Sequence, residues 1–477
     1  MAEAKQGPPP LNPCGDKDVK CKLIVAYVSL SSFFILHMID INSRHVAVTC
    51  GIPIHNIGIY FDKIHTVRWL VWLIATEVEY AIFQIAGADR DPDDPNKGRR
   101  VRRWVNIICL FFVVIVRIAI FLSFFLSSNL AYHFYVLICI EAFVFGPYSD
   151  SYTALCAQYM TFISPIFNLC RLYVMGIQFI LDRLWFDNPL RMLKIIYFIV
   201  AFMTVIAFGL LAYLNFNLKD AAYQPPKPGS TSGPKGGGPA CESEMCKECE
   251  KKFGNDGPRA VLSPLMMNYA LCVVKEFLYP ATLPYALLKR DRCHAINMWL
   301  PFINNIGPLF YFCLDMFSDY FKCWNWKYDL MWLTFVPLPV IYAYSLMAIH
   351  TRNPSAMKIR NSRPRVMLMT FLVFFCYGCL NPLGMIGVAK YAFRRNHLGF
   401  TIMGLNLVII MLMRSFFNRL SVGYTDVRVS LGYHLPKFRP KHRMSKSNVR
   451  WYIFRQTFII AWKDMKSDVT LDIKKYL

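Results

Sequence analysis

The chain has 477 residues, of which 55% are hydrophobic and only 17% are charged, whereas soluble domains carry about a quarter of charged residues. This composition excludes an ordinary soluble protein and predicts an integral membrane protein. The formal net charge of +23 fits topology signals and contact with anionic headgroups, and we expect no nucleic-acid partner because no nucleic-acid-binding motif is present.

Apolar segments long enough to cross a lipid bilayer, about 20 residues each, recur along the chain with short gaps between them. They predict eleven spans, near 22–40, 66–87, 104–127, 129–149, 152–181, 191–216, 261–288, 296–320, 328–350, 365–391 and 398–421. The fourth and fifth spans are separated only by the GPYSDS sequence at 146–151. The expected fold class is therefore all-α, a polytopic membrane helix bundle in a 6+5 arrangement, and the protein is expected to be multi-pass in the plasma membrane.

A polar segment rich in Pro, Gly and Ser divides the spans into two groups, because it cannot bury enough apolar surface to fold alone. The expected domains are a polar N-terminal segment at 1–21, a six-helix bundle at 22–216, a cytoplasmic linker at 217–260, a five-helix bundle at 261–421 and a basic tail at 422–477. The linker contains Cys241, Cys246 and Cys249, but no histidine or second cysteine pair lies nearby. We expect free or palmitoylated cysteines there, with no metal and no cofactor.

The tail contains an amphipathic stretch at 448–466, with aromatic residues at helical spacing and basic residues beside them. Such a helix is expected either to lie in the plane of an anionic leaflet or to pack against the loops of the bundle itself. The arginine cluster at 99–103, in a short loop, favours a cytoplasmic N-terminus and linker. An odd number of spans then puts the tail on the opposite side.

Asp315 and Asp319 stand four residues apart near the end of the span at 296–320, so they share one face of a helix. A carboxylate at membrane depth costs several kcal/mol, roughly, unless it faces a bundle interior, a water-filled cavity or a partner. The default interpretation is a functional site, and the alternative for Asp319 is an interfacial residue. Glu141 and Arg117 are further charges at depth, and they could instead pair with each other and fix helix packing, as could the adjacent Lys275 and Glu276.

Short motifs in five spans add a resemblance to a known family. They are EAFVFG at 141–146, YMT at 159–161, YPAT at 279–282, FVPL at 335–338 and YGCLNPLGM at 377–385. With the six-plus-five layout, they resemble the corresponding motifs of the equilibrative nucleoside transporters, and Asp315 stands where that family has the aspartate of its D-x-x-G-R motif. The resemblance implies a major-facilitator-like two-bundle transporter.

The chain departs from this family at several functional positions. Ser318 and Asp319 replace the Gly-Arg that follows the family's aspartate, Glu141 stands in place of a glutamine, and His37 ends the Ile-Leu-His that replaces the first-span Pro-Trp-Asn. Such divergence also resembles the Tpr-related multi-spanning proteins of piroplasm parasites. Substrate identity is therefore not simply inherited from the family.

The resemblance implies a transporter of small polar solutes, most simply nucleosides or nucleobases, that works by alternating access between its two bundles. Its expected substrate-binding residues are Glu141, Asp315, Asp319, His37 and Asn381, with Arg117 as a candidate charge partner. Carboxylates accept the N–H and O–H donors of a purine or ribose. Crowded carboxylates also repel each other's charge, which predicts a proton-sensitive cycle unless Arg117 or another cation lies within reach.

Two other classes of protein are weighed against a transporter. A non-transporting membrane protein that acts in host or partner interaction would keep the same scaffold, and the missing arginine after Asp315 favours it. A polytopic enzyme is not expected, because no D-H-H-C, G-x-S-G or H-E-x-x-H motif occurs. The expected partners are the lipid bilayer and a small-molecule substrate, and the sequence gives no oligomeric state.

Overall fold

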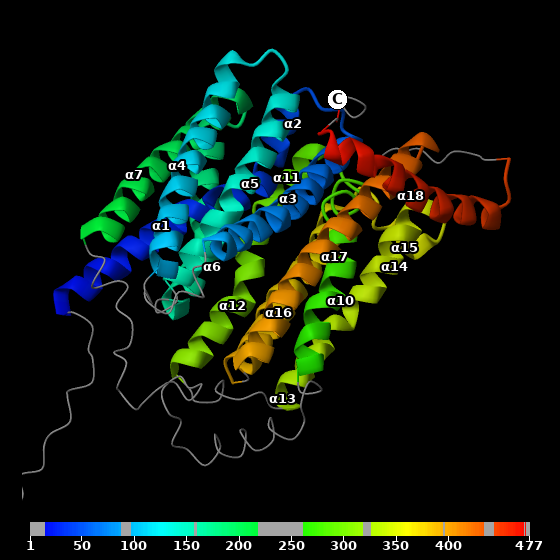
Figure 1. The fold of residues 1–477 in the computed structure, drawn as a ribbon. Helices are drawn as coiled ribbons and strands as arrows, with labels where there is room; N and C mark the ends of the chain where they lie inside the picture. The colour runs from blue at the N-terminus through cyan, green and yellow to red at the C-terminus, as the bar shows by residue number, and fades with distance from the viewer. Residues whose placement is uncertain are drawn as a thin grey trace, which may run out of the picture.

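The computed structural model describes residues 15–86, 97–156, 160–217, 261–317, 326–394, 396–433, 443–471 and 473. Over these residues every regular element is a helix, and no strand is present. The predicted all-α fold class is confirmed. Figure 1 shows the long helices running alongside one another as a bundle.

The part before the linker, which we call the N-half, contains seven helices among its described residues. They are α1 (Gly15–Ile41), α2 (Ser43–Thr49), α3 (Ile57–Ile85), α4 (Lys97–Leu126), α5 (Leu130–Leu155), α6 (Met160–Trp185) and α7 (Pro189–Asn217). The helices α1 and α6 pack on each other, as do α4 and α5. The short α2 continues the chain from α1 across one end of the bundle (Figure 1).

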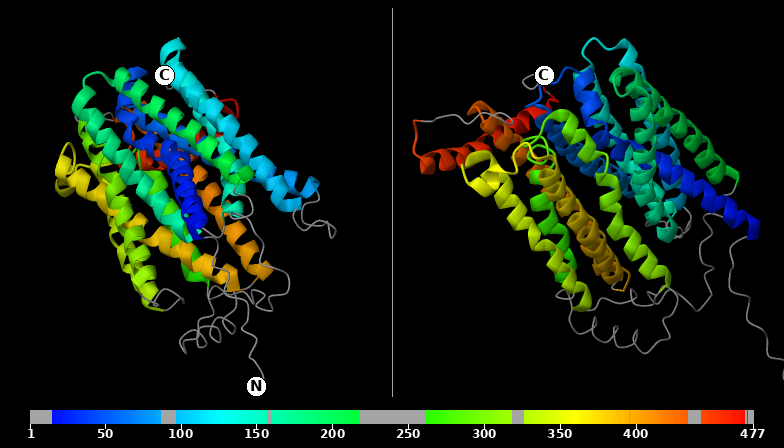
Figure 2. Two further views of the ribbon diagram at one scale, coloured as in Figure 1. Left: turned by 90° about the vertical axis from the view of Figure 1, so that its left-hand side faces the viewer. Right: turned by 180° about the vertical axis from the view of Figure 1, so that it is seen from behind.

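The part after the linker, which we call the C-half, ends with α17 and is followed by the tail helix α18. Its elements are α10 (Leu262–Leu278), α11 (Arg290–Asn297), α12 (Leu300–Phe317), α13 (Trp326–Asp329), η4 (Leu330–Phe335), α14 (Pro337–His350), α15 (Pro354–Met357), α16 (Arg363–Arg394) and α17 (Asn396–Ser430), then α18 (Lys446–Val469). Across the two halves, α3 packs on α17 and α6 packs on α12. These contacts join two helical bundles side by side (Figures 1 and 2).

Seven helices in the described ranges are long and apolar enough to cross a membrane. They are the segments Lys20–Ile41, Arg100–Leu126, Leu130–Thr153, Pro189–Phe216, Lys327–His350, Arg363–Val388 and Leu405–Ser430. The helices α4 and α7 also expose large apolar side chains, among them Phe111, Phe112, Ile115, Phe198 and Phe202. Because the outside is apolar while charged groups are buried inside, the natural solvent for this surface is lipid.

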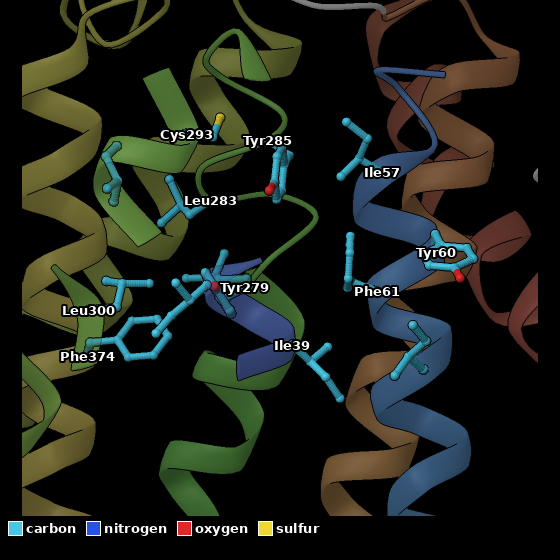
Figure 3. Packing of buried hydrophobic residues seen from close by; sticks show 14 of the residues in the cluster. Ile39, Ile57, Tyr60, Phe61, Tyr279, Leu283, Tyr285, Cys293, Leu300 and Phe374 are labelled. Atoms are coloured by element: carbon cyan, nitrogen blue, oxygen red, sulfur yellow. The ribbon is translucent and has the colours of Figure 1, made fainter. Parts of the chain in front are cut away.

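Several helix boundaries differ from those that the sequence predicted. The expected span at 261–288 is helical only to Leu278, because Pro280 and Pro284 have no N–H to donate to a helix. Residues 279–288 instead form a buried irregular stretch in which both prolines follow cis peptide bonds. Figure 3 shows Tyr279, Leu283 and Tyr285 of this stretch between α3 and the C-half helices.

Another predicted boundary lies elsewhere, and two prolines do not interrupt their helices. The expected break at 146–151 is inside α5, which runs through Pro147 to Leu155, and α6 begins at Met160. Pro308 lies inside α12 and Pro382 inside α16, and both helices are continuous. At the end of the C-half, α17 continues to Ser430, beyond the predicted end of the last span at residue 421.

The tail helix α18 lies across the end of the bundle, at the same end as α2 and α11 (Figure 1). It packs against α17 at Gly423, where a Cβ would lie 2.5 Å from the carbonyl oxygen of Thr457. The side of α18 that faces the bundle is buried at Ile453 and Ala461, while Trp451 and Trp462 are exposed. The helix therefore packs on the bundle and also presents an aromatic stripe outward.

Candidate functional site

Glu141 and Arg117, both predicted at membrane depth, form an enclosed ion pair inside the N-half. The Glu141 Oε1 atom accepts hydrogen bonds from Nε of Arg117 at 3.2 Å and from Nη2 at 2.8 Å. Arg117 also donates to the carbonyl oxygens of Ser31 and Ser32 and to the Thr204 hydroxyl. The guanidinium thus connects four helices, α1, α4, α5 and α7. The pairing of Arg117 with Glu141, weighed as an alternative from the sequence, is present.

Arg68 of α3 lies beside this pair and is also within electrostatic reach of Asp40. Its Nη2 lies 3.9 Å from Glu141 Oε2, and its Nε and Nη1 are buried without a hydrogen-bond partner among the described residues. His37 of α1, a predicted site residue, is half-buried, lies edge-on to Phe167 and is within electrostatic reach of Arg68. Buried N–H donors need an acceptor, so Arg68 is placed to bind water or a solute.

The other predicted site residues are spread along the C-half. Asp315 lies in the last turn of α12, where the structure describes the backbone but not this side chain, and Asp319 lies outside the described residues. Asn381 is half-buried on α16, one helical turn from Tyr377. The expected meeting of Glu141 and Asp315 in one cavity remains a prediction.

Charged side chains from both halves meet where the N-half faces the C-half. We call Asp40, His65, Lys275, Glu276 and Arg414 the interface cluster. Asp40 of α1 and His65 of α3 lie 2.9 Å apart, and Asp40 is within electrostatic reach of Lys275 on α10. Lys275 and Glu276 are 2.9 Å apart, and Glu276 lies 3.6 Å from Arg414 of α17.

Access differs within the interface cluster. The side chain of Asp40 keeps 35% of its surface exposed and that of Lys275 keeps 18%, whereas that of Glu276 keeps only 3%. Charged groups between apolar helices are costly unless they have a partner or reach a polar cavity. Asp40 and Lys275 therefore mark the accessible part of the interface cluster.

Aromatic side chains border the interface cluster on both sides. The Arg414 guanidinium stands 4.6 Å above the ring of Trp69 on α3, and its Nη2 donates a hydrogen bond of 2.6 Å to the Tyr377 hydroxyl on α16. The Trp69 ring is in turn stacked on that of Trp72. Flat rings next to carboxylates and a guanidinium offer both stacking and hydrogen bonding to a planar polar solute.

Reasoning from the sequence missed most of this cluster. Asp40 and His65 stand at the edges of predicted spans, where a charged residue gives no signal of a site. Lys275 and Glu276 are recognised from the sequence as adjacent charges, which either pair and fix helix packing or belong to a functional site. Arg414 is an ionisable residue in the middle of the last predicted span. That signal alone marks a functional candidate.

Fold and site together define a class: a multi-pass helical membrane protein with two bundles that meet at a polar, accessible interface. The lipid-facing apolar surface and the buried charges are both explained by this class. The predicted two-bundle arrangement is confirmed by the contacts between α3 and α17 and between α6 and α12.

No protein-family model and no curated protein matches the chain. Solved structures that it resembles include a D-xylose–proton symporter, with a TM-score of 0.54, 11% identity and coverage of 94% of this chain and 97% of that chain. The xylose transporter XylE from E. coli, in a partially occluded inward-open conformation, gives a TM-score of 0.50 at 11% identity, with coverage of 95% and 98%. The POT-family transporter PepTSo gives 0.50 at 13% identity, with coverage of 95% and 99%. At these identities the likeness shows that the chain shares their helical two-bundle fold.

Proposed function

We propose that this chain is a membrane transporter that carries a small polar solute through the interface between its two halves. The observation that carries the proposal is the interface cluster, in which charged side chains of both halves meet between the helices, with 35% of the Asp40 side chain and 18% of the Lys275 side chain exposed. Intramembrane charges are costly, and their usual role is to line the pathway of a substrate or ion. The two-bundle fold supports alternating access, in which one half rocks against the other around a central site.

The proposed solute is a nucleoside or nucleobase. The carboxylates of Asp40 and Glu276 can accept N–H and O–H donors of such a solute, and Arg414 can donate to its ring acceptors. The motif resemblance to equilibrative nucleoside transporters supports the same class of solute. His37, Asn381, Asp315 and Asp319 are retained as further candidates, whereas Glu141 is paired with Arg117 inside the N-half and is assigned to helix packing.

The proposed orientation places the N-terminus and the linker in the cytoplasm and the tail on the other side of the plasma membrane. The described start of α1 and the tail helix α18 lie at opposite ends of the bundle (Figure 1), which agrees with an odd number of spans. At the α18 end the halves touch through α2 and α11.

Uptake of labelled solutes by cells that express the chain tests the proposal. The panel contains adenosine, hypoxanthine, xylose and a dipeptide, and the matched negative control is the double variant Asp40→Asn with Glu276→Gln. We expect saturable uptake of adenosine or hypoxanthine that the control variant lacks. Protein at the cell surface with no saturable uptake of any solute would contradict transport and favour the non-transporting alternative.

A further inference from the structure

Three side chains able to bind metal, none of them a member of the interface cluster, gather at the α18 end of the molecule. They are His45 of α2, Asp182 of α6 and His294 of α11. The His45 Nε2 atom lies 3.1 Å from Asp182 Oδ1, and the His294 Nε2 atom lies 2.7 Å from Asp182 Oδ2. One ligand atom from each residue lies within 4.8 Å of the others, and both histidines are buried.

We propose that His45, Asp182 and His294 bind a divalent transition-metal ion, with Zn²⁺ as the best fit. Imidazole nitrogen and carboxylate oxygen are the ligands that Zn²⁺ takes, and three protein ligands with one open position make a common zinc geometry. Hard cations such as Mg²⁺ and Ca²⁺ prefer oxygen ligands, so two histidines select against them.

The surroundings orient the carboxylate and cover one side of the two imidazoles. The Gln178 amide donates a hydrogen bond of 2.7 Å to Asp182 Oδ1, which orients the carboxylate. The ring of Phe186 stands about 6 Å from both imidazoles, at 5.9 and 6.0 Å, and covers one side of the site. The Nδ1 atom of His294 is buried without a hydrogen-bond partner among the described residues, so that ring is fixed only through its Nε2 side. Outer groups of this kind typically change metal affinity by about 10–100-fold.

One neighbour opposes binding and sets the chemistry of the site. The Arg44 Nη1 atom lies 3.3 Å from His45 Nδ1, which therefore accepts a hydrogen bond and leaves the proton on Nε2. Binding an ion at Nε2 moves that proton to Nδ1, so Arg44 must turn away. Arg44 would still have a partner after turning away from His45, because its Nε lies 2.8 Å from Asp291 Oδ1.

The position of the site gives the ion a role. His45 and Asp182 belong to the N-half and His294 to the C-half, so a bound ion would tie the two halves together at the end where α2 meets α11. An ion that binds one conformation only shifts the population toward that conformation. Zn²⁺ is therefore a ligand that holds this end of the molecule closed.

Binding is tested on the purified full-length protein, carrying an affinity tag without histidine and stripped with a chelator. We expect saturable Zn²⁺ binding at micromolar concentration and a rise in the thermal midpoint of about 3 °C at saturating ion. His45→Gln, His294→Gln and Asp182→Asn should each weaken Zn²⁺ binding by more than about tenfold, and Gln178→Leu by about tenfold. The matched control is His133→Gln, which changes an exposed histidine outside the cluster and should leave binding unchanged.

A second measurement needs no variant, in case a ligand substitution prevents folding. Co²⁺ in place of Zn²⁺ should give the intense visible absorption of a four-coordinate site. A hydrated six-coordinate spectrum, or Zn²⁺ binding that is equal in the wild type and in the His45→Gln and His294→Gln variants, would overturn the proposal. These readouts do not depend on transport, so the site can stand or fall separately from the proposed function. If the zinc site and the transport function are both correct, Zn²⁺ should inhibit uptake by the wild type and should not inhibit uptake by the His294→Gln variant.

Discussion

The pair Arg117–Glu141 and the interface cluster contain the same kinds of side chain but differ in access. Arg117 and Glu141 are sealed inside the N-half, where the guanidinium is fully occupied by four helices. Asp40 and Lys275, at the boundary between the halves, keep contact with water. The difference teaches that charge at membrane depth marks a binding site only where it stays accessible, and otherwise fixes helix packing.

The largest expected effect comes from breaking the sealed pair. Replacing Arg117 with Met leaves Glu141 buried without its main partner, which costs about 3–5 kcal/mol of folding free energy. We expect a large fall in the thermal midpoint of the purified protein. The double variant Arg117→Met with Glu141→Met should recover much of that loss, because it removes both charges. A single variant as stable as the wild type would show that the pair is not the structural element described above.

The accessible charges should behave in the opposite way. Asp40→Asn is expected to reduce uptake by about 10–100-fold, the loss of a hydrogen bond to a charged group, while the thermal midpoint changes little because 35% of the Asp40 side chain is exposed. Glu79→Gln is the matched control, since Glu79 pairs with Arg102 at 3.8 Å outside the interface cluster. Unchanged uptake, or loss of the folded protein, would show that the interface cluster fixes helix packing and does not bind the solute.

Lys63 of α3 is an intermediate case. It is buried like Arg117, but its partners lie on the tail helix α18 and not inside the N-half. Its Nζ lies 2.7 Å from Asp464 and 2.9 Å from Asp468 of α18, and Asp468 also pairs with Arg419 of α17 at 3.1 Å. Lys63→Met should cost about 2 kcal/mol, less than the Arg117 variant, because Asp468 keeps Arg419. We expect faster proteolytic removal of α18 with the bundle intact. Removal of α18 at the wild-type rate would show that the ion pairs of Lys63 do not hold α18 on the bundle.

The smallest expected effect is the pH dependence of uptake. The sequence predicts proton-sensitive carboxylates unless a cation such as Arg117 lies within reach. Because Arg117 lies 2.8 Å from Glu141, Glu141 is not expected to exchange a proton during the cycle. A few-fold change in uptake between about pH 5.5 and 8 should then come from Asp315 and Asp319. Uptake by Asp315→Asn is expected to be flat over this range. A flat profile in the wild type would remove the proton-sensitive part of the proposal.

The helical fold could be predicted from the sequence because the bilayer sets the length and apolarity of each span. Helix ends were harder to place, as at Leu278, where only the folded chain shows that residues 279–288 leave the helix and stay buried. The candidate site was predicted in part. Glu141 and Arg117 were recognised as charges at depth, but their distance from each other, which decides their role, depends on how α4 and α5 pack.

The sequence by itself determined that this is a multi-spanning helical membrane protein and marked some of the charges that matter, among them Glu141, Arg117, Lys275 and Glu276. Only the tertiary structure decided which charges meet, because contacts such as Asp40 with His65, or His45 with Asp182 and His294, join residues far apart along the chain. Helical periodicity fixes which residues share a face, but not which face of another helix they meet. That choice depends on the packing of two bundles, and it separates the sealed pair, the accessible cluster and the proposed metal site.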